Sequence, residues 1–167
     1  LILALSKGPT SFSEALEKAF LEYSRDWFLN NRQYETCRDQ DLARWHRFAD
    51  WFFEQGYQIL KTRLCSAISV NTSCNHVAVS ELSAQADLVL KKGEHVYALS
   101  IFPNEPQYSV RARKQETQAY YSLELLSQYL ISAPAYGQET ISMICYLKSK
   151  EDKADFLASQ YTEGKCY

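Results

Sequence analysis

Apolar residues recur every three or four positions in the first third of the chain, as they do along one face of a helix. Ser11 and Glu14 form a capping-box pattern before such a run, which predicts a helix over about residues 12–30. Asp39 precedes a second run and predicts the cap of a second helix that ends close to Gly56. The spacing indicates that the aromatic residues of both helices pack in a core.

The pattern then changes to that of strands. Apolar or β-rich runs at residues 64–70, 77–79 and 86–90 predict three strands, and residues 96–102 form the returning arm of a hairpin. A nearly continuous apolar run over residues 141–147 predicts a strand that is buried on both faces.

A long helix is predicted between the hairpin and the last of these strands, because residues 111–132 contain neither Gly nor Pro. Its predicted apolar face comprises Ala119, Leu123, Leu126 and Leu130, with Leu125 and Tyr129 alongside. Residues 149–160 predict a closing helix. A strand-helix-strand crossover places the last strand parallel to a neighbour, so we expect an α/β (α+β) fold with a mixed central sheet flanked by helices.

The length of 167 residues predicts a single domain. The apolar run Leu1–Leu5 is too short to cross a membrane, and residues 1–10 are expected to be a linker or the end of a preceding segment. The expected domain covers residues 11–167, divided into a helical lead-in (11–60), a core (62–148) and a closing helix (149–167).

Composition and charge narrow the classes of function. The chain carries 18 Lys and Arg against 20 Asp and Glu, a formal charge of −2, which excludes a generally basic nucleic-acid binder but leaves room for a local basic patch. Its five cysteines form no Cys-x-x-Cys pair and are not spaced with the three histidines as metal ligands. We therefore expect free thiols and a cytoplasmic location.

The segment Ala84-Gln85-Ala86-Asp87 leads through a turn into Ala98-Leu99-Ser100. In the order α-βββ-α-β, residues 64–147 resemble the core of the PD-(D/E)XK nuclease superfamily, and its RecB-type branch in particular. That family carries Gly-x-x-Asp on one strand and Asp/Glu-x-Lys on the next. The resemblance implies a restriction-endonuclease-like core, with Ala84 at the glycine position and Asp87 at the first acid.

The sequence departs from this family at the second motif, where Ala98 replaces the acid and Ser100 the lysine. Both positions fall on one face of a strand, so both lost groups belong to the same site. Family members hold a divalent metal between carboxylates, and Asp87 alone is a weak metal ligand and a residual catalytic acid. The branch's Gln-x-x-x-Tyr motif is matched only loosely, because Gln118 and Tyr121 lie three positions apart.

Two interpretations of Asp87 remain open at this level. A rearranged catalytic site would combine it with Glu81 and Lys114 around Mg²⁺ or Mn²⁺. Alternatively, it is a strand-end carboxylate that makes a local hydrogen bond.

A basic cluster begins the long helix. Arg111, Arg113 and Lys114 lie within four residues, with Tyr108 before them and Gln118 one turn after them. Helix N-termini attract phosphate, and these cations add charge-assisted contacts, so the cluster is a candidate nucleic-acid contact. The alternative is a solvated first turn that pairs with nearby acids.

Three functions follow. The first is a catalytically inactive nuclease-like domain that binds DNA or RNA, or docks other domains or partner subunits, within a larger nucleic-acid-processing protein. The second is a metal-dependent nuclease with a rearranged site, the only one that requires a cofactor. The third is a protein-interaction domain that uses exposed aromatic anchors. No membrane partner is expected.

Overall fold

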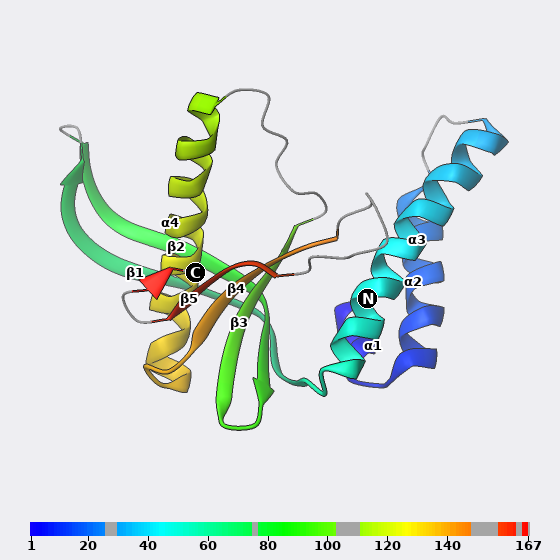
Figure 1. The fold of residues 1–167 in the computed structure, drawn as a ribbon, viewed down its shortest axis with the longest axis horizontal. Coiled ribbons are helices and arrows are strands. Elements are labelled where there is room, and N and C mark those ends of the chain that lie inside the picture. Colours follow the sequence, from blue (N-terminus) through cyan, green and yellow to red (C-terminus); the bar gives the residue numbers. More distant parts are fainter. Residues whose placement is uncertain (26–29, 75–76, 103–110, 148–156, 163–164, 167) are drawn as a thin grey trace.

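The computed structural model describes residues 1–25, 30–74, 77–102, 111–147, 157–162 and 165–166. For residues 70–74, 77–80, 82, 111–123, 157–162 and 165–166 it describes the backbone path alone. Three helices come first: α1 (Ile2–Leu5), α2 (Pro9–Tyr23) and α3 (Asn31–Glu54) (Figure 1). The remaining elements are β1 (Gln58–Cys74), β2 (Val77–Lys92), β3 (His95–Phe102), α4 (Arg111–Tyr136), β4 (Ile141–Tyr146), β5 (Leu157–Thr162) and β6 (Lys165–Cys166).

The six strands form one sheet in the order β1-β2-β3-β4-β5-β6. β3 and β4 are parallel, with Ala98 opposite Ser142, and every other neighbouring pair is antiparallel. The predicted α+β class with a mixed central sheet is therefore confirmed, as is the parallel placement of β4. The order from α3 to β4 is α-βββ-α-β.

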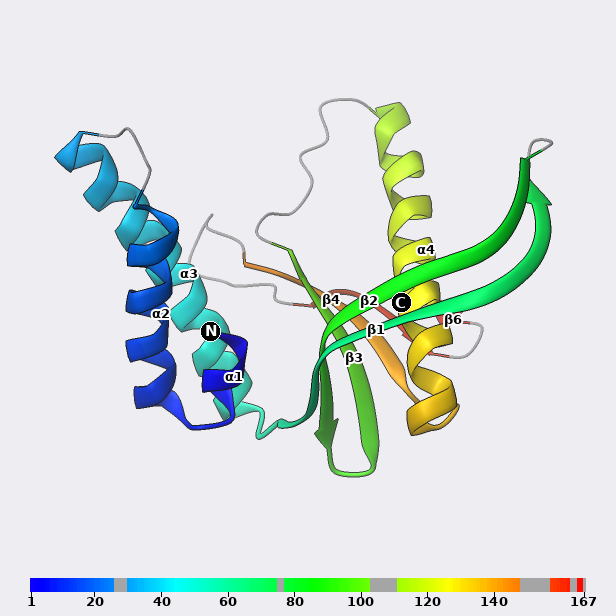
Figure 2. The same ribbon diagram turned by 180° about the vertical axis from the view of Figure 1, so that it is seen from behind.

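Helices cover both faces of this sheet, and the alternation of side chains along β3 shows how. Leu99 packs in a cluster with Phe12 of α2 and Phe48 of α3, whereas its neighbour Ala98 packs with Ile131 of α4. Successive residues of a strand point to opposite faces, so α1–α3 lie on one face and α4 on the other. Figure 2 shows the same arrangement from behind.

The strand β4 is buried from Ser142 onward, as its apolar sequence predicts. Met143 and Cys145 enter the cluster on the α1–α3 face, and Ile144 and Tyr146 pack with Leu125 of α4. Like β3, this strand therefore packs against both helical layers.

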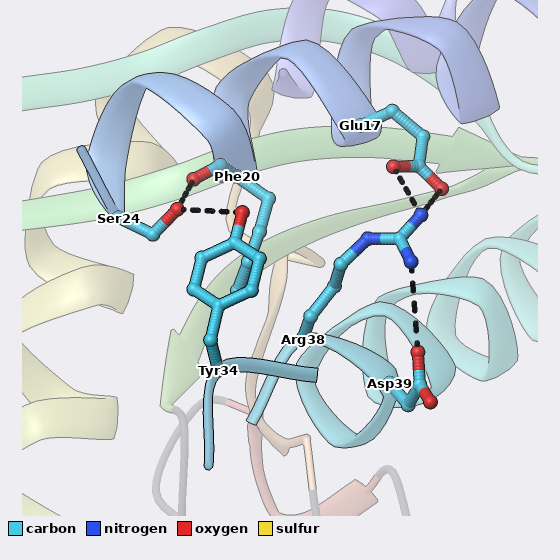
Figure 3. Close-up of polar contacts among 6 residues, drawn as sticks. All are labelled: Glu17, Phe20, Ser24, Tyr34, Arg38 and Asp39. Atoms are coloured by element: carbon cyan, nitrogen blue, oxygen red, sulfur yellow. Dashed lines mark hydrogen bonds and ion pairs between the residues drawn. The ribbon is translucent and has the colours of Figure 1, made fainter. Parts of the chain in front are cut away.

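Polar contacts fix α2 against α3 (Figure 3). Arg38 Nη2 donates to both carboxylate oxygens of Glu17, at 3.2 and 3.0 Å, and this hydrogen bonding raises the pKa of Arg38. Ser24 Oγ donates to the Phe20 carbonyl at 2.7 Å and lies 3.3 Å from Tyr34 Oη. Both side chains of the Glu17–Arg38 pair are partly exposed to solvent, so the pair is expected to contribute little to stability.

The first long helix starts earlier than predicted, and the capping box at Ser11 is wrong. α2 begins at Pro9, whose missing N–H and preset φ suit the first helical position. Gly8 is the N-cap with a φ of 100°, a conformation that favours glycine.

The third helix also starts earlier than predicted, because Asn30 and not Asp39 is its cap. Asn30 Oδ1 accepts from the Gln33 amide at 2.9 Å, and Gln33 Oε1 accepts from the Asn30 amide at 3.2 Å. This reciprocal pair is a capping box with Asn and Gln in place of the more familiar Ser and Glu.

Two strand assignments change as well. Residues 77–79 and 86–90, predicted as separate strands, belong to the single strand β2, which pairs with β1 along most of its length. The predicted closing helix is wrong over residues 157–160, where the chain forms β5 and pairs with β4. Without β5, β4 would present an unpaired edge, and pairing that edge outweighs a weak helical pattern. Residues 149–156 lie outside the described residues.

The buried face of α4 is rotated from the predicted one. Leu130 is 36% exposed, whereas Leu125 and Tyr129 are buried together with the polar residues Gln128 and Ser132. An interpretation that follows apolar residues alone misses this face, because polar side chains occupy part of the contact with the sheet. The helix also continues through Pro134 to Tyr136.

The first ten residues differ from the expected linker. Ile2–Leu5 form α1, and Leu5 is 2% exposed within the cluster shared by α1–α3 and the sheet. No helix within the described ranges combines the length and apolar character that crossing a bilayer requires.

Candidate functional site

The candidate site lies where β2 and β3 separate. Their pairing runs from Lys92 opposite His95 to Leu88 opposite Leu99, and Asp87 is the next residue of β2. Asp87 Oδ2 accepts a hydrogen bond from the backbone N–H of Ile101 at 2.7 Å. A carboxylate oxygen of β2 thus accepts the hydrogen bond of a β3 amide just beyond the last paired residues of the two strands.

The other oxygen of Asp87 makes a weaker contact. Asp87 Oδ1 accepts from Gln85 Nε2 at 3.2 Å. Both donors are neutral, and Asp87 forms no ion pair with any described residue. The described residues also contain no group of three or more His, Cys, Asp or Glu that is arranged to hold a metal ion.

The two positions that the family resemblance assigns to an acid and a lysine both face α4. Ala98 is fully buried in an apolar cluster with Leu64, Val89 and Ile131. Ser100 is 5% exposed and accepts a hydrogen bond from Gln128 Nε2 at 2.6 Å. Position 98 therefore offers a methyl group in apolar surroundings, and position 100 offers a hydroxyl that is already bonded.

Two residues of α4 complete this polar group, and neither was singled out from the sequence. Glu124 Oε1 lies 3.4 Å from Ser100 Oγ and 3.3 Å from Gln128 Nε2. Glu124 and Gln128 are four residues apart, which places both side chains on one face of α4. A polar pair at that spacing inside an apolar stripe was the available signal. The loosely matched Gln118 and Tyr121 lie upstream on the same helix.

Two buried polar atoms in this layer have no hydrogen-bond partner within the described part of the chain. They are Gln128 Oε1 and Ser142 Oγ, on fully buried residues of α4 and β4. Most buried polar groups in folded proteins are hydrogen-bonded, so these two atoms are exceptions. Both lie in the contact between α4 and the sheet, where Gln128 also bonds to Ser100.

The structure does not bring Glu81 to Asp87. Glu81 lies six positions before Asp87 on β2, which corresponds to about 20 Å of extended strand. Glu81 is exposed, pairs in register with Ser69 of β1, and accepts a long hydrogen bond of 3.5 Å from Ser83 Oγ. Lys114 precedes Glu124 by ten helical residues, about 15 Å along the axis of α4.

The basic cluster lies in the first described turns of α4, and the backbone is helical there as the sequence predicts. The helix begins at Arg111, so Arg113, Lys114 and Gln118 lie in its first two turns. Tyr108 lies outside the described residues. In both views these first turns extend past β3 and β4, toward the level that the curved ends of β1 and β2 reach (Figures 1 and 2).

Comparison with known proteins assigns no family to this arrangement. No protein-family model matches the chain, and no curated protein sequence matches it. The resemblance to PD-(D/E)XK nucleases therefore remains a prediction that rests on the element order and on Asp87.

Proposed function

We propose that the chain is a catalytically inactive nuclease-like domain that binds nucleic acid as one module of a larger DNA- or RNA-processing protein. The observation that carries this proposal is the environment of Ala98 and Ser100. The first is enclosed by apolar side chains and the second is bonded to Gln128.

Metal-dependent phosphodiester cleavage requires carboxylates that converge on one ion, and the described residues contain no group of three or more His, Cys, Asp or Glu arranged in this way. A catalytic divalent ion is held by carboxylates and activates a water molecule. Asp87 already accepts two hydrogen bonds, and position 98 provides no second carboxylate. The polar group of Ser100, Glu124 and Gln128 contains no cation that would replace the missing lysine.

Nucleic-acid binding is supported by the position of the helix start. In the described part of the chain α4 starts at Arg111, so the cations at 111, 113 and 114 fall in its first described turn. The start of a helix offers free backbone N–H groups and the positive end of its dipole to a phosphate. The overall charge of −2 confines such binding to a local patch.

Catalytic inactivity is tested by incubating the full chain with single- and double-stranded DNA and RNA in Mg²⁺ or Mn²⁺. We expect no cleavage above that of an Asp87→Asn variant. The matched control is Glu139→Gln, which removes the same charge at an exposed position before β4. Cleavage that persists in the control but disappears in Asp87→Asn would establish the nuclease with a rearranged site instead.

Binding is tested by fluorescence anisotropy with labelled oligonucleotides over a range of salt concentrations. Replacing Arg111 and Arg113 by Ala should weaken binding and lower the slope of log affinity against log salt by about two. The control replaces Lys7 and Lys18, two exposed cations of the α1–α3 layer, and should leave the slope unchanged. Equal losses in both variants would show that the helix start is not the contact. If the wild-type chain does not bind, a protein-interaction domain becomes the preferred function.

A further inference from the structure

A second feature of Asp87 is the cavity that it lines. A pocket of about 320 Å³ lies between the helices α2 and α3 and the ends of β3 and β4. The residues that give it chemical character are Tyr23, Asp41, Arg44, Trp45, Asp87 and Ile101. Its volume is at the lower end of the range for small-molecule sites.

The charges around this pocket do not balance. Arg44 Nη1 donates to Asp41 Oδ1 at 3.0 Å, so these two side chains neutralise each other. Asp87 is hydrogen-bonded only by neutral groups and has no cationic partner among the described residues. Among the described residues of the pocket, Asp87 therefore carries the one charge that has no oppositely charged partner, on a half-buried carboxylate that is suited to pair with a cation.

The walls suit an organic cation better than a metal ion. Tyr23 and Trp45 supply aromatic rings, which attract ammonium and guanidinium groups through their π faces. A smaller recess of about 200 Å³ adjoins this pocket, shares Tyr23, Asp41 and Trp45 with it, and extends to Leu16 and Phe20. A charged group on an apolar stem would place its charge near Asp87 and its stem toward this recess.

We propose that this pocket binds a guanidinium or ammonium group carried on an apolar stem, with Asp87 as its charge partner. The Arg side chain has this chemistry, because its planar fork pairs with carboxylates and stacks on aromatic rings. A small organic amine has the same chemistry. The inference does not depend on nucleic-acid binding, because neither the phosphate backbone nor the start of α4 takes part in it.

The test is an NMR titration of the ¹⁵N-labelled full chain, followed at the indole N–H of Trp45. The probes are N-acetyl-arginine amide and N-acetyl-citrulline amide, which have nearly the same shape but differ in charge. We expect saturable shifts with the arginine probe and at least about tenfold weaker binding of the citrulline probe, as charge-assisted hydrogen bonds require.

Three variants locate the site. Asp87→Asn keeps an acceptor for the Ile101 amide and should remove the preference for arginine over citrulline. Tyr23→Leu, at a side chain that is 73% exposed, should weaken arginine binding by about threefold through loss of the aromatic face. Glu139→Gln, at the opposite end of β4, should leave the preference unchanged.

Equal affinity for the two probes, no saturable shift, or an unchanged preference in Asp87→Asn would overturn the proposal. The source of the cation is resolved by comparing n-butylguanidinium with N-acetyl-leucyl-arginine amide. Tighter binding of the dipeptide assigns the site to an arginine of a partner protein, because the adjoining recess then holds the leucine. Equal binding assigns it to a small organic amine.

Discussion

At the residue scale, Asp87 supplies an acceptor that the amide of Ile101 would otherwise lack where β2 leaves β3. The sequence alone allowed both a catalytic role and a local hydrogen bond for this carboxylate. Which of the two applies depends on the conformation of two strand ends, and no local pattern encodes that geometry.

Replacing Asp87 by Ala should therefore lower the free energy of unfolding by about 1–2 kcal/mol, because a partly buried backbone N–H loses its partner. Asp87→Asn should cost less, since its side-chain carbonyl can accept the same hydrogen bond. Urea denaturation of both variants measures the difference. Equal stability of the two would show that the Ile101 contact contributes nothing to the fold.

Cys145 provides a prediction for pH dependence. Burial raises the pKa of its thiol to about 12, from an ordinary value near 9.0. Between these values the unfolded chain releases a proton that the folded chain keeps. Above pH 9, stability should thus fall by up to about 1.4 kcal/mol per pH unit from this group.

The free energy of unfolding of the wild type and of Cys145→Ala is measured by urea denaturation at several alkaline pH values. The contribution of Cys145 is the difference between the slopes of the two variants against pH. Parallel pH profiles would contradict it. As an independent check, the exposed Cys65 should react with a thiol reagent in the native protein and Cys145 only after unfolding.

At the scale of elements, the periodicity of the sequence predicts that α4 is a helix but does not predict which of its faces is buried. The sequence predicts the helix, its start at Arg111 and the buried strand that follows. The face that meets the sheet is different, because Gln128 and Ser132 occupy it. Hydrophobic spacing cannot identify buried polar residues whose partners, such as Ser100, lie on another element.

Two leucines of α4 test this orientation. Leu125→Ala should lower the free energy of unfolding by about 2–4 kcal/mol, because the side chain is 1% exposed and packs against Ile144 and Tyr146. Leu130→Ala, at 36% exposure, should cost less than about 1 kcal/mol. Chemical denaturation of both variants measures the effect, and the reverse order would restore the face predicted from the sequence.

The strands show a similar division. β4 could be predicted because a short, unbroken apolar run is typical of a strand buried on both faces, whereas β5 could not, because pairing with the edge of β4 decides its structure. The spacing of Glu124 and Gln128 places them on one helix face, but their contact with Ser100 could not be predicted, since it joins β3 to the middle of α4. Asp87 was identified from a motif, but its neighbours in the pocket come from α2 and α3.

At the scale of the whole molecule, one apolar cluster joins the helical layer to the sheet. Phe12, Phe48, Leu99 and Met143 belong to it, so α2, α3, β3 and β4 depend on the same contacts. We predict that the two layers unfold together. Fluorescence of Trp45 and Trp51 reports on the helical layer, and hydrogen exchange at the β3 amides reports on the sheet.

Their urea transitions should coincide, as expected for a two-state domain. Destabilising the shared cluster by Phe48→Ala should move both midpoints by the same amount. Separate midpoints would show two independently folding units, with a boundary near the start of β1.

The parallel pair β3–β4 has a consequence for the path by which the chain folds. β1, β2 and β3 follow one another as antiparallel neighbours and need only short turns, whereas joining Phe102 to the start of β4 closes a loop over residues 103–140. The entropy of closing a loop grows with its length, and such non-local pairing slows folding. A nascent chain therefore exposes the open side of β3 until α4 and β4 have been synthesised, and in that interval the edge is a target for wrong partners and for chaperones.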